Sequence, residues 1–450
     1  MRVLDVGSLL DAQEWSRYQK LIVAATALTI VLDGFDNQLI GIAVLPLMGE
    51  WDLPRAAFAP VLASGMVGMM VGGAIGGFIG DRVGRRKALL ASVGSFGALT
   101  AFTPIVDDVF ALGVLRFFIG LGLGGAMPNS AALVSEYVPA RRRPFAVTLT
   151  IVCIPIGGTL AGLVGAQILP QLGWKALFLA GGLVPLVLAF ALWKTLPESP
   201  RYLARHPQQW PELTQLLRRL HYEVPPGASF VDATEKSITR VSPRELLRPE
   251  FRRDTLALSA SFFFCLLTVY VGVNWVPSML AGAGFDVGVA SNGLAAFNLG
   301  GVAGALIGAA LIRRVGSRPA MLAMSTGAVA GAAALAVMPL APQSAFVVLV
   351  MLAWTGGWIN GVQVTMYALA AHVYPTGIRA TGVGTAVALG RMGGVLSPYA
   401  GSWALESGGA SQLFTLLAAT MTVVLVALAS VRHHIPRAVP LVVSHASTTM

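Results

Sequence analysis

The chain contains 450 residues, of which 55% are hydrophobic and only 12% are charged, and its formal net charge is +10. Together with a mean hydropathy of +0.72, this composition excludes an ordinary water-soluble enzyme. The six His residues show no metal-ligand spacing, Cys153 and Cys265 are isolated, and the phosphate loop GxxxxGK[ST] is absent, so we expect no metal, no cofactor and no ATP-driven step.

Apolar stretches of about 20 residues, the length that a helix needs to cross a ~30 Å hydrocarbon core, recur along the whole sequence. The first stretch is long, carries two acids and lacks a small-residue cleavage pattern, so we expect it to stay in the mature chain. The pattern predicts an all-α membrane protein with twelve transmembrane helices, at 20–43, 57–79, 88–105, 109–133, 145–167, 174–193, 255–278, 289–311, 320–338, 345–369, 380–401 and 412–431.

The positions of Lys and Arg predict the orientation, because cytoplasmic loops keep positive charge during membrane insertion. With a cytoplasmic N-terminus, Arg55 and Lys175 lie outside and Arg116 and Arg391 lie within spans, while the other 27 of the 31 basic residues lie inside. We therefore expect both termini in the cytoplasm. The charge indicates contact with anionic membrane lipids and not with nucleic acid, since no basic stretch is interleaved with aromatic residues.

A polar segment at 194–253, with eleven Lys or Arg residues, divides the predicted spans into six plus six. The two sets resemble each other, because GGAIGGFIGDRVGRRKALL (72–90) recurs 232 positions later as GALIGAALIRRVGSRPAML (304–322). Parallel repeats are typical of transporters that rock two pseudo-symmetric halves around a site near the bilayer midplane. The expected parts are an N-terminal six-helix bundle at 1–193, a cytoplasmic linker at 194–253, a C-terminal six-helix bundle at 254–431 and a cytoplasmic tail at 432–450.

Three motifs resemble the major facilitator superfamily: GFIGDRVGRRK (77–87), RFFIGLGLGGAMPNSAALVSEYVPARRR (116–143) and LPESPRYL (196–203). The resemblance covers nearly the whole chain and implies a secondary transporter, which we expect to be a monomer and not an enzyme. It also implies that the loop containing Asp81 closes the cytoplasmic face, where this acid can pair with basic neighbours. The residues expected to act in this gate are Asp81, Arg82, Arg85, Arg86, Glu136 and Arg143.

Two features qualify the expected gate. In the second repeat Arg313 occupies the place of Asp81, so that half lacks the acid. Glu136 lies near the Arg141 to Arg143 run, where an ordinary solvated helix end explains its position as well as a gating ion pair does.

The subfamily is indicated by DGFD (33–36), RFFIGLGLGGAMPN (116–129) and ATGVGTAVALGRMGG (380–394). Together they resemble the aromatic acid:proton symporter family. This resemblance implies import of a benzoate-, hydroxybenzoate- or phenylpropanoid-like acid together with protons, across the inner (cytoplasmic) membrane of a bacterium.

Asp33 and Asp36 lie three residues apart within the first predicted span, which brings their side chains to nearly one face of a helix. An ionised Asp at the centre of a bilayer costs at least about 2.5 kcal/mol, so each acid needs a cavity, a partner or a proton. We interpret them as candidates for proton coupling. The alternative is a structural salt bridge or a polar pair that packs helices.

Arg116 and Arg391 are the two cations within predicted spans. The planar guanidinium fork can hold both oxygens of a carboxylate, so both residues are candidate ligands for an organic anion. The alternative is that each Arg is a permanent partner of Asp33 or Asp36. We expect proton handling in the first half and an anion contact from the second half.

Two further pairs of residues are candidate contacts for an aromatic substrate. Trp354 and Trp358, one turn apart and followed by Asn360 and Gln363, offer aromatic faces for a ring, and Tyr270 and Asn274 form a similar pair. The alternative for both pairs is ordinary helix packing.

The other classes of function receive less support from the sequence. A membrane enzyme needs a clustered nucleophile and base or a metal constellation, and a receptor needs an output domain, neither of which is visible. Within transport, the alternatives are an exporter or a carrier of a non-aromatic acid such as muconate or nicotinate.

Overall fold

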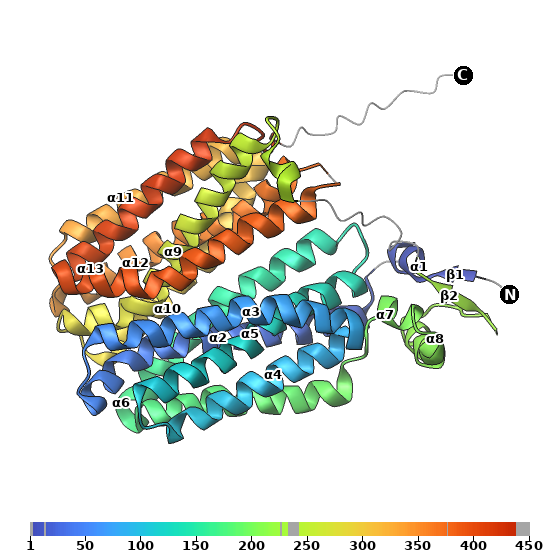
Figure 1. Ribbon diagram of the computed structural model, residues 1–450, viewed down its shortest axis with the longest axis horizontal. Helices are drawn as coiled ribbons and strands as arrows, with labels where there is room; N and C mark the ends of the chain where they lie inside the picture. Colours follow the sequence, from blue (N-terminus) through green and yellow to red (C-terminus); the bar gives the residue numbers. More distant parts are fainter. Residues whose placement is uncertain (1–2, 13–14, 226, 233–242, 376, 438–450) are drawn as a thin grey trace.

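The computed structural model describes residues 3–12, 15–225, 227–232, 243–375 and 377–437. Long helices dominate these residues (Figure 1). We call α2 to α6 the first helical group and α9 to α13 the second helical group, because the helices of each group pack mainly against one another. We also name the two ends of the molecule after α2, as the Arg17 end and the Trp51 end.

The long helices follow the predicted apolar stretches closely. The first group consists of α2 (Arg17–Trp51), α3 (Ala59–Val83), α4 (Arg85–Phe102), α5 (Val109–Tyr137) and α6 (Arg143–Thr195). The second group consists of α9 (Arg252–Gly282), α10 (Val287–Val315), α11 (Ser317–Val337), α12 (Ala345–Val373) and α13 (Arg379–Ser430).

Ten helices among the described residues are long and apolar enough to cross a membrane. The twelve predicted stretches all fall on these helices, with two stretches each on α6 and α13. Both of these long helices are interrupted: Gly173 in α6 has a φ of 75°, and Gly409 in α13 has a φ of 62°. Glycine adopts this left-handed backbone conformation without a steric penalty, so it permits a sharp break in each helix.

Local sequence signals explain where several helices begin and end. Ser16 and Gln19 form a capping box at the start of α2, and Asp108 and Asp286 cap α5 and α10 through their carboxylates. These side chains accept hydrogen bonds from the otherwise unpaired first N–H groups of each helix.

Repeated glycines bring equivalent helices of the two groups into close contact. A Cβ at Gly72 of α3 would collide with the backbone of Leu121 in α5, and a Cβ at Gly304 of α10 would collide with the backbone of Gly357 in α12. Small residues of this kind allow membrane helices to approach closely. The predicted sequence repeat therefore corresponds to the same helix contact made once in each group.

A small unit lies at the Arg17 end of the first group (Figure 1). It contains α1 (Val6–Ala12), α7 (Pro200–Ala204), α8 (Trp210–Arg219) and the parallel strands β1 (Val3–Asp5) and β2 (Ser229–Val231). Two three-residue strands are the one departure from the predicted all-α class among the described residues.

Leucines of the small unit belong to the same apolar cluster as residues of α4 and α5. The first part of the segment predicted as a linker is thus folded onto the first group, in two helices, one strand and the short 3-10 turn η3 (Pro207–Gln209). Its last part forms the 3-10 turn η5 (Pro243–Leu247), which contacts α9 and α13 of the second group. The part of the linker at 233–242 lies outside the described residues.

The first residues of the predicted tail are held by the second group. The Asp254 carboxylate at the start of α9 accepts a hydrogen bond from the backbone N–H of Arg432 at 2.8 Å, and it lies 2.6 Å from Nδ1 of His433. The backbone N–H of Ile435 donates to Oγ of Ser317. The remainder of the predicted tail, 438–450, lies outside the described residues.

Contacts between the two groups occur toward the Trp51 end. Gln38 of α2 and Asn298 of α10 exchange two hydrogen bonds through their side-chain amides, at 2.7 and 3.2 Å. Nη2 of Arg55 in η1 (Arg55–Phe58) donates to the carbonyl of Ser278 in α9 at 3.3 Å. The two groups are therefore joined at this end by buried polar contacts as well as by packing.

Candidate transport site

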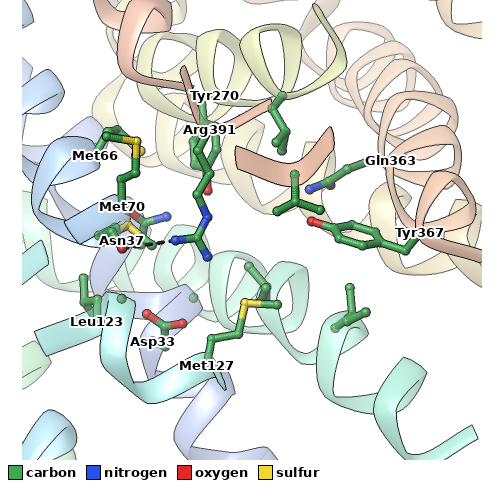
Figure 2. A pocket seen from close by; sticks show the side chains of 17 residues that line it. Asp33, Asn37, Met66, Met70, Leu123, Met127, Tyr270, Gln363, Tyr367 and Arg391 are labelled. Atoms are coloured by element: carbon green, nitrogen blue, oxygen red, sulfur yellow. Dashed lines mark hydrogen bonds between the residues drawn. The ribbon is translucent and has the colours of Figure 1, made fainter. Parts of the chain in front are cut away.

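A cavity lies between the two groups, near the middle of the helices (Figure 2). Its polar lining side chains are Asp33, Asn37, Tyr270, Gln363, Tyr367 and Arg391. The lining includes Asp33, which lies nearer the Arg17 end of α2 than Gln38 does, residues near the centre of α5, and residues of α6, α12 and α13 on the side of the Arg17 end. The cavity thus lies on the Arg17 side of the contact between Gln38 and Asn298.

Asp33 is provided by the middle of α2 and is buried in the protein. Its Oδ1 atom has no hydrogen-bond partner among the described residues, and the side chain lies at the wall of the cavity (Figure 2). A buried carboxylate without a partner is costly when ionised. This position therefore suits a group that gains and loses a proton as the contents of the cavity change.

Arg391 comes from α13 and reaches across to the first group. Its Nη1 atom donates to the backbone carbonyl of Met69 in α3 at 3.2 Å, and the guanidinium points into the cavity (Figure 2). A Cβ added at Gly73 would lie 2.5 Å from the same nitrogen, so the absence of a side chain at this glycine leaves room for the guanidinium. Among the described residues, the bond to Met69 is the hydrogen bond that the Arg391 guanidinium makes, so its remaining N–H groups can bind an anion in the cavity.

The opposite side of the cavity carries two polar side chains of α12. Tyr367 and Gln363 lie one helical turn apart, and the Tyr367 hydroxyl points into the cavity (Figure 2). The Tyr367 ring packs edge-to-face on Phe262 with centroids 5.2 Å apart, which fixes its orientation. Elsewhere in the cavity lining, the side chain of Tyr270 in α9 interacts with the side chain of Asn37 in α2.

Methionines provide much of the apolar lining. Met66, Met69 and Met70 of α3 and Met127 of α5 border the cavity. Thioether side chains adapt to irregular shapes and make favourable contacts with aromatic rings. A mostly apolar cavity with a few convergent polar groups has the composition of a small-molecule site.

Asp36, one turn beyond Asp33, has a different environment. Its Oδ1 accepts a hydrogen bond from the Thr100 hydroxyl of α4 at 2.6 Å, and its Oδ2 lies 3.6 Å from Nη1 of Arg116 in α5. The Arg116 guanidinium also stacks 5.3 Å from the centre of the Phe178 ring. Both charges are buried within the first group, as expected for permanent partners.

The structure does not bring the two tryptophans to this cavity. The Trp354 side chain is 51% exposed on the outer surface of α12, and its indole N–H donates to the carbonyl of Gly327 in α11 at 3.3 Å. Trp358 packs edge-to-face on Trp354 and contacts Gly327. Both residues therefore pack α12 against α11, and we leave them out of the substrate site.

Asn274 also lies away from the cavity lining. It is buried where α9 packs against Gly41 of α2, and neither atom of its side-chain amide has a hydrogen-bond partner among the described residues. The predicted pair of Tyr270 and Asn274 is thus divided, because only Tyr270 faces the cavity.

The predicted gate residues form a cluster at the Arg17 end. Asp81 of α3 forms an ion pair with Arg85 of α4, and Nε of Arg85 lies 3.5 Å from Oε1 of Glu136 in α5. Glu136 also accepts a hydrogen bond from the Ser199 hydroxyl. Glu136, whose side chain is 12% exposed, is therefore a partly buried member of a polar cluster and is not a solvated helix end.

The other three gate candidates make separate contacts. Arg82 stacks on Phe78, and Arg143 lies 3.3 Å from a carboxylate oxygen of Asp11. Burial lowers the pKa of Arg143, with Asp11 acting in the opposite direction. The Arg86 side chain donates to the carbonyl of Trp193 at the end of α6.

Sequence reasoning missed several residues of the site. Asn37 directly follows DGFD (33–36) but has no charge to mark it, and Tyr367 lies one turn beyond Gln363 in an apolar helix. At the gate it missed Glu198, which accepts a hydrogen bond from the backbone N–H of Arg86 at 2.9 Å. The LPESPRYL motif contains Glu198 and Ser199, and it is the sequence signal that could have pointed to Glu198.

A mostly apolar cavity with a few polar side chains, lined by two groups of helices that are long and apolar enough to cross a membrane, is typical of solute carriers. The chain belongs to the Major Facilitator Superfamily, whose model matches residues 26–398. The protein is thus a multi-pass membrane transporter and not an enzyme.

Curated relatives match nearly the whole chain. A gallate transporter from Pseudomonas putida is 34% identical over 416 residues, which cover 92% of each chain. The 4-hydroxybenzoate transporter PcaK from Pseudomonas aeruginosa is 35% identical over 90% of each chain. A benzoate transport protein from Acinetobacter baylyi is 29% identical over 90% of this chain and 87% of that protein.

Solved structures support the same fold. The xylose transporter XylE from E. coli, in a partially occluded inward open conformation, superimposes with a TM-score of 0.69 at 18% identity over 91% of this chain and 97% of that one. A bacterial homolog of the human lysosomal transporter Spinster gives a TM-score of 0.67 at 17% identity, over 93% and 97% of the two chains.

Proposed function

We propose that the protein imports a hydroxylated aromatic carboxylate together with protons by alternating access. The observation that carries this proposal is the cavity in which Asp33 of the first group and Arg391 of the second group face the same space. The similarity to gallate, 4-hydroxybenzoate and benzoate transporters supports an aromatic acid as the substrate.

The proposed architecture has twelve transmembrane helices in two six-helix halves. As a straight helix, the 53 residues of α6 would extend ~80 Å, far more than the ~30 Å hydrocarbon core. The break at Gly173 in α6 and the break at Gly408 and Gly409 in α13 divide each long helix into two crossings. The proposed halves are 1–193 and 254–431, joined by 194–253.

The proposed location is the inner membrane of a bacterium, with both termini and the Arg17 end in the cytoplasm. The distribution of Lys and Arg supports this orientation. Single cysteines placed near Asp107 and Glu406 should react with an impermeant maleimide added to intact cells, and one near Ser237 should not. Labelling at Ser237 in sealed cells would reverse the orientation.

In the proposed binding mode, the substrate carboxylate pairs with Arg391. The aromatic ring lies among the methionine side chains, where thioethers contact its edge and face. A ring hydroxyl on the far side of the carboxylate then meets Tyr367 and Gln363. In this arrangement, α13 of the second group binds the carboxylate and α12 of the second group binds the ring hydroxyl. The methionines of the first group contact the ring.

The proposed proton carrier is Asp33. When the cavity is empty, Arg391, which lines the same cavity, is a cation that can stabilise its ionised form. A substrate carboxylate that occupies the Arg391 guanidinium removes part of that stabilisation, so anion binding favours protonation of Asp33. Substrate and proton then enter the cavity together, which is the requirement for symport.

The proposed conformation is inward-facing. The polar contacts at the Trp51 end close that side, since Gln38 and Asn298 join the groups there. Opening outward requires these bonds to break and the cluster of Asp81, Arg85 and Glu136 to meet the second group. Asp81→Asn is therefore expected to slow cycling while leaving the equilibrium affinity for substrate largely intact.

The proposed function is tested by uptake into proteoliposomes. The purified protein is offered radiolabelled gallate, 4-hydroxybenzoate, benzoate, muconate and nicotinate, with and without an inward proton gradient. We expect accumulation of hydroxylated benzoates only when the gradient is imposed. Accumulation of muconate or nicotinate in preference to the benzoates would contradict the substrate class, and equal accumulation against a concentration gradient with and without the proton gradient would contradict proton coupling.

A further inference from the structure

A second hollow, of about 190 Å³, lies at the Arg17 end between the start of α4, the end of α6 and α8. It is well above the ~10–15 Å³ that a single water needs. Arg86, Lys194 and Arg219 line it together with one acid, Glu212, and the amide of Gln215. Three cations against one carboxylate give this hollow a positive charge, and it is separate from the transport cavity.

Exposed aromatic residues indicate the depth of the hollow in the bilayer. On the last turns of α6, Phe190 and Trp193 are 57% and 59% exposed. Tryptophan is enriched where the hydrocarbon core meets the headgroups. Lys194 follows Trp193 directly, and its ammonium lies 4.5 Å from the centre of the Phe190 ring. The hollow therefore lies at the depth of lipid headgroups.

Arg86 provides a second, independent observation. Its Nη2 donates to the carbonyl of Trp193, but its buried Nε has no hydrogen-bond partner among the described residues. A buried guanidinium N–H without an acceptor carries a desolvation cost. Arginine N–H groups pair best with the oxygens of phosphate or carboxylate. Arg86 lines the hollow, so an anionic oxygen bound there would give its guanidinium an acceptor besides the Trp193 carbonyl.

We propose that the hollow binds the phosphate group of an anionic phospholipid, with Lys194 and Arg219 on its two sides and Arg86 at its base. Basic pockets at the membrane surface bind lipid phosphates in this way. The Gln215 amide and the Glu212 carboxylate are then positioned for headgroup hydroxyls. Because Arg219 belongs to α8 and Lys194 to α6, the bound lipid links the small unit to the first helical group.

The test uses the full-length protein in detergent, titrated with phosphatidylglycerol and, in separate arms, with phosphatidylethanolamine and inorganic phosphate, and analysed by native mass spectrometry. The test variant is Lys194→Gln/Arg219→Gln, which removes two exposed charges. The matched control is Lys87→Gln/Arg218→Gln, which removes two exposed charges from α4 and α8 that do not line the hollow.

We expect the test variant to bind phosphatidylglycerol at least roughly tenfold more weakly than wild type, since each basic residue near a phosphate contributes on the order of 1 kcal/mol. The control variant should bind it with nearly the wild-type affinity. Equal affinity of the two variants would overturn the site. Saturable binding of inorganic phosphate that displaces the lipid would support the phosphate chemistry but overturn the assignment to a phospholipid.

Discussion

Asp33 and Asp36 lie one turn apart on the same helix, yet they belong to different parts of the molecule. Asp36 is enclosed by α4 and α5, where Thr100 and Arg116 bind it. Asp33 faces a cavity, and the cation that shares this cavity, Arg391, comes from the other helical group. The pair of Asp36 and Arg116 thus lies within the first helical group, whereas the pair of Asp33 and Arg391 spans the two groups.

From this difference we infer that Asp36 and Arg116 form a structural pair and that Asp33 and Arg391 take part in the transport cycle. When two helical groups move relative to each other, contacts within either group persist, whereas contacts between the groups change. An acid whose partner moves is able to exchange its proton during the cycle. Of the two acids, Asp33 is therefore the one that we expect to couple proton movement to transport.

The largest expected effect is on stability, from Asp36→Asn. The amide keeps the size of the side chain and its bond to Thr100, but leaves the buried Arg116 charge unpaired. Loss of one partner from a buried ion pair costs about 3–5 kcal/mol, so the thermal unfolding temperature in detergent should fall markedly. The double variant Asp36→Asn/Arg116→Met removes both charges and should recover most of the loss. A single variant as stable as wild type would show that this pair is not structural.

The next largest effect is on substrate affinity, from Arg391→Ala. Loss of a charge-assisted carboxylate contact should raise the Kd by about a hundredfold, since such hydrogen bonds contribute about 1.5–3 kcal/mol each. Arg391→Lys should fall between Ala and wild type, because an ammonium keeps the charge but not the two-pronged geometry. Isothermal titration of purified protein with 4-hydroxybenzoate measures this series. An unchanged Kd in the Ala variant would exclude Arg391 from the site.

A smaller effect is expected on selectivity, from Tyr367→Phe. In the proposed binding mode, this change removes the hydroxyl that bonds to the ring hydroxyl of the substrate. Loss of such a hydrogen bond costs about 0.5–1.5 kcal/mol of binding free energy. Binding of 4-hydroxybenzoate should weaken up to about tenfold, while binding of benzoate stays the same. Tyr399→Phe, at an exposed position of α13, serves as the control. Equal weakening of both ligands would mean that Tyr367 does not recognise the hydroxyl.

The smallest effect is expected from Gly73→Ala. The added Cβ meets the end of the flexible Arg391 side chain, which can shift aside, so uptake should fall only a few-fold. Gly77→Ala on the same helix has open space around the new Cβ and gains the same helix propensity. Comparing the initial uptake rates of the Gly73→Ala and Gly77→Ala variants separates the effect of the contact with Arg391 from the effect of helix propensity. Similar rates in the two variants would show that the guanidinium does not need this space.

The sequence predicted the helices well, because each span depends on a local run of apolar residues. It also singled out Asp33 and Arg391, which the structure places in the cavity lining, since an isolated charge within an apolar span is visible without knowledge of the fold. It did not distinguish Asp33 from Asp36. That distinction depends on where α4 and α5 pack around α2, which no local pattern records.

The same limit explains the other differences. The spacing of Trp354 and Trp358 indicates a shared helix face but not whether that face meets α11 or the cavity. Tyr367 is a neutral residue in an apolar helix, so it stands out only once its helix is oriented. The pairing of β1 with β2 joins the beginning of the chain to the central segment, and contacts of such long sequence separation are not encoded in local periodicity.

The most direct test of the account compares accumulation with exchange for Asp33→Asn. Asn keeps the size of the side chain but cannot titrate, and exchange does not require the empty carrier to return through its cycle. In proteoliposomes, this variant should lose proton-driven accumulation of 4-hydroxybenzoate and keep counterflow, whereas Asp36→Asn/Arg116→Met should keep both. If Asp33→Asn accumulates substrate in response to a pH gradient as well as wild type does, Asp33 is not the coupling residue and the account is wrong.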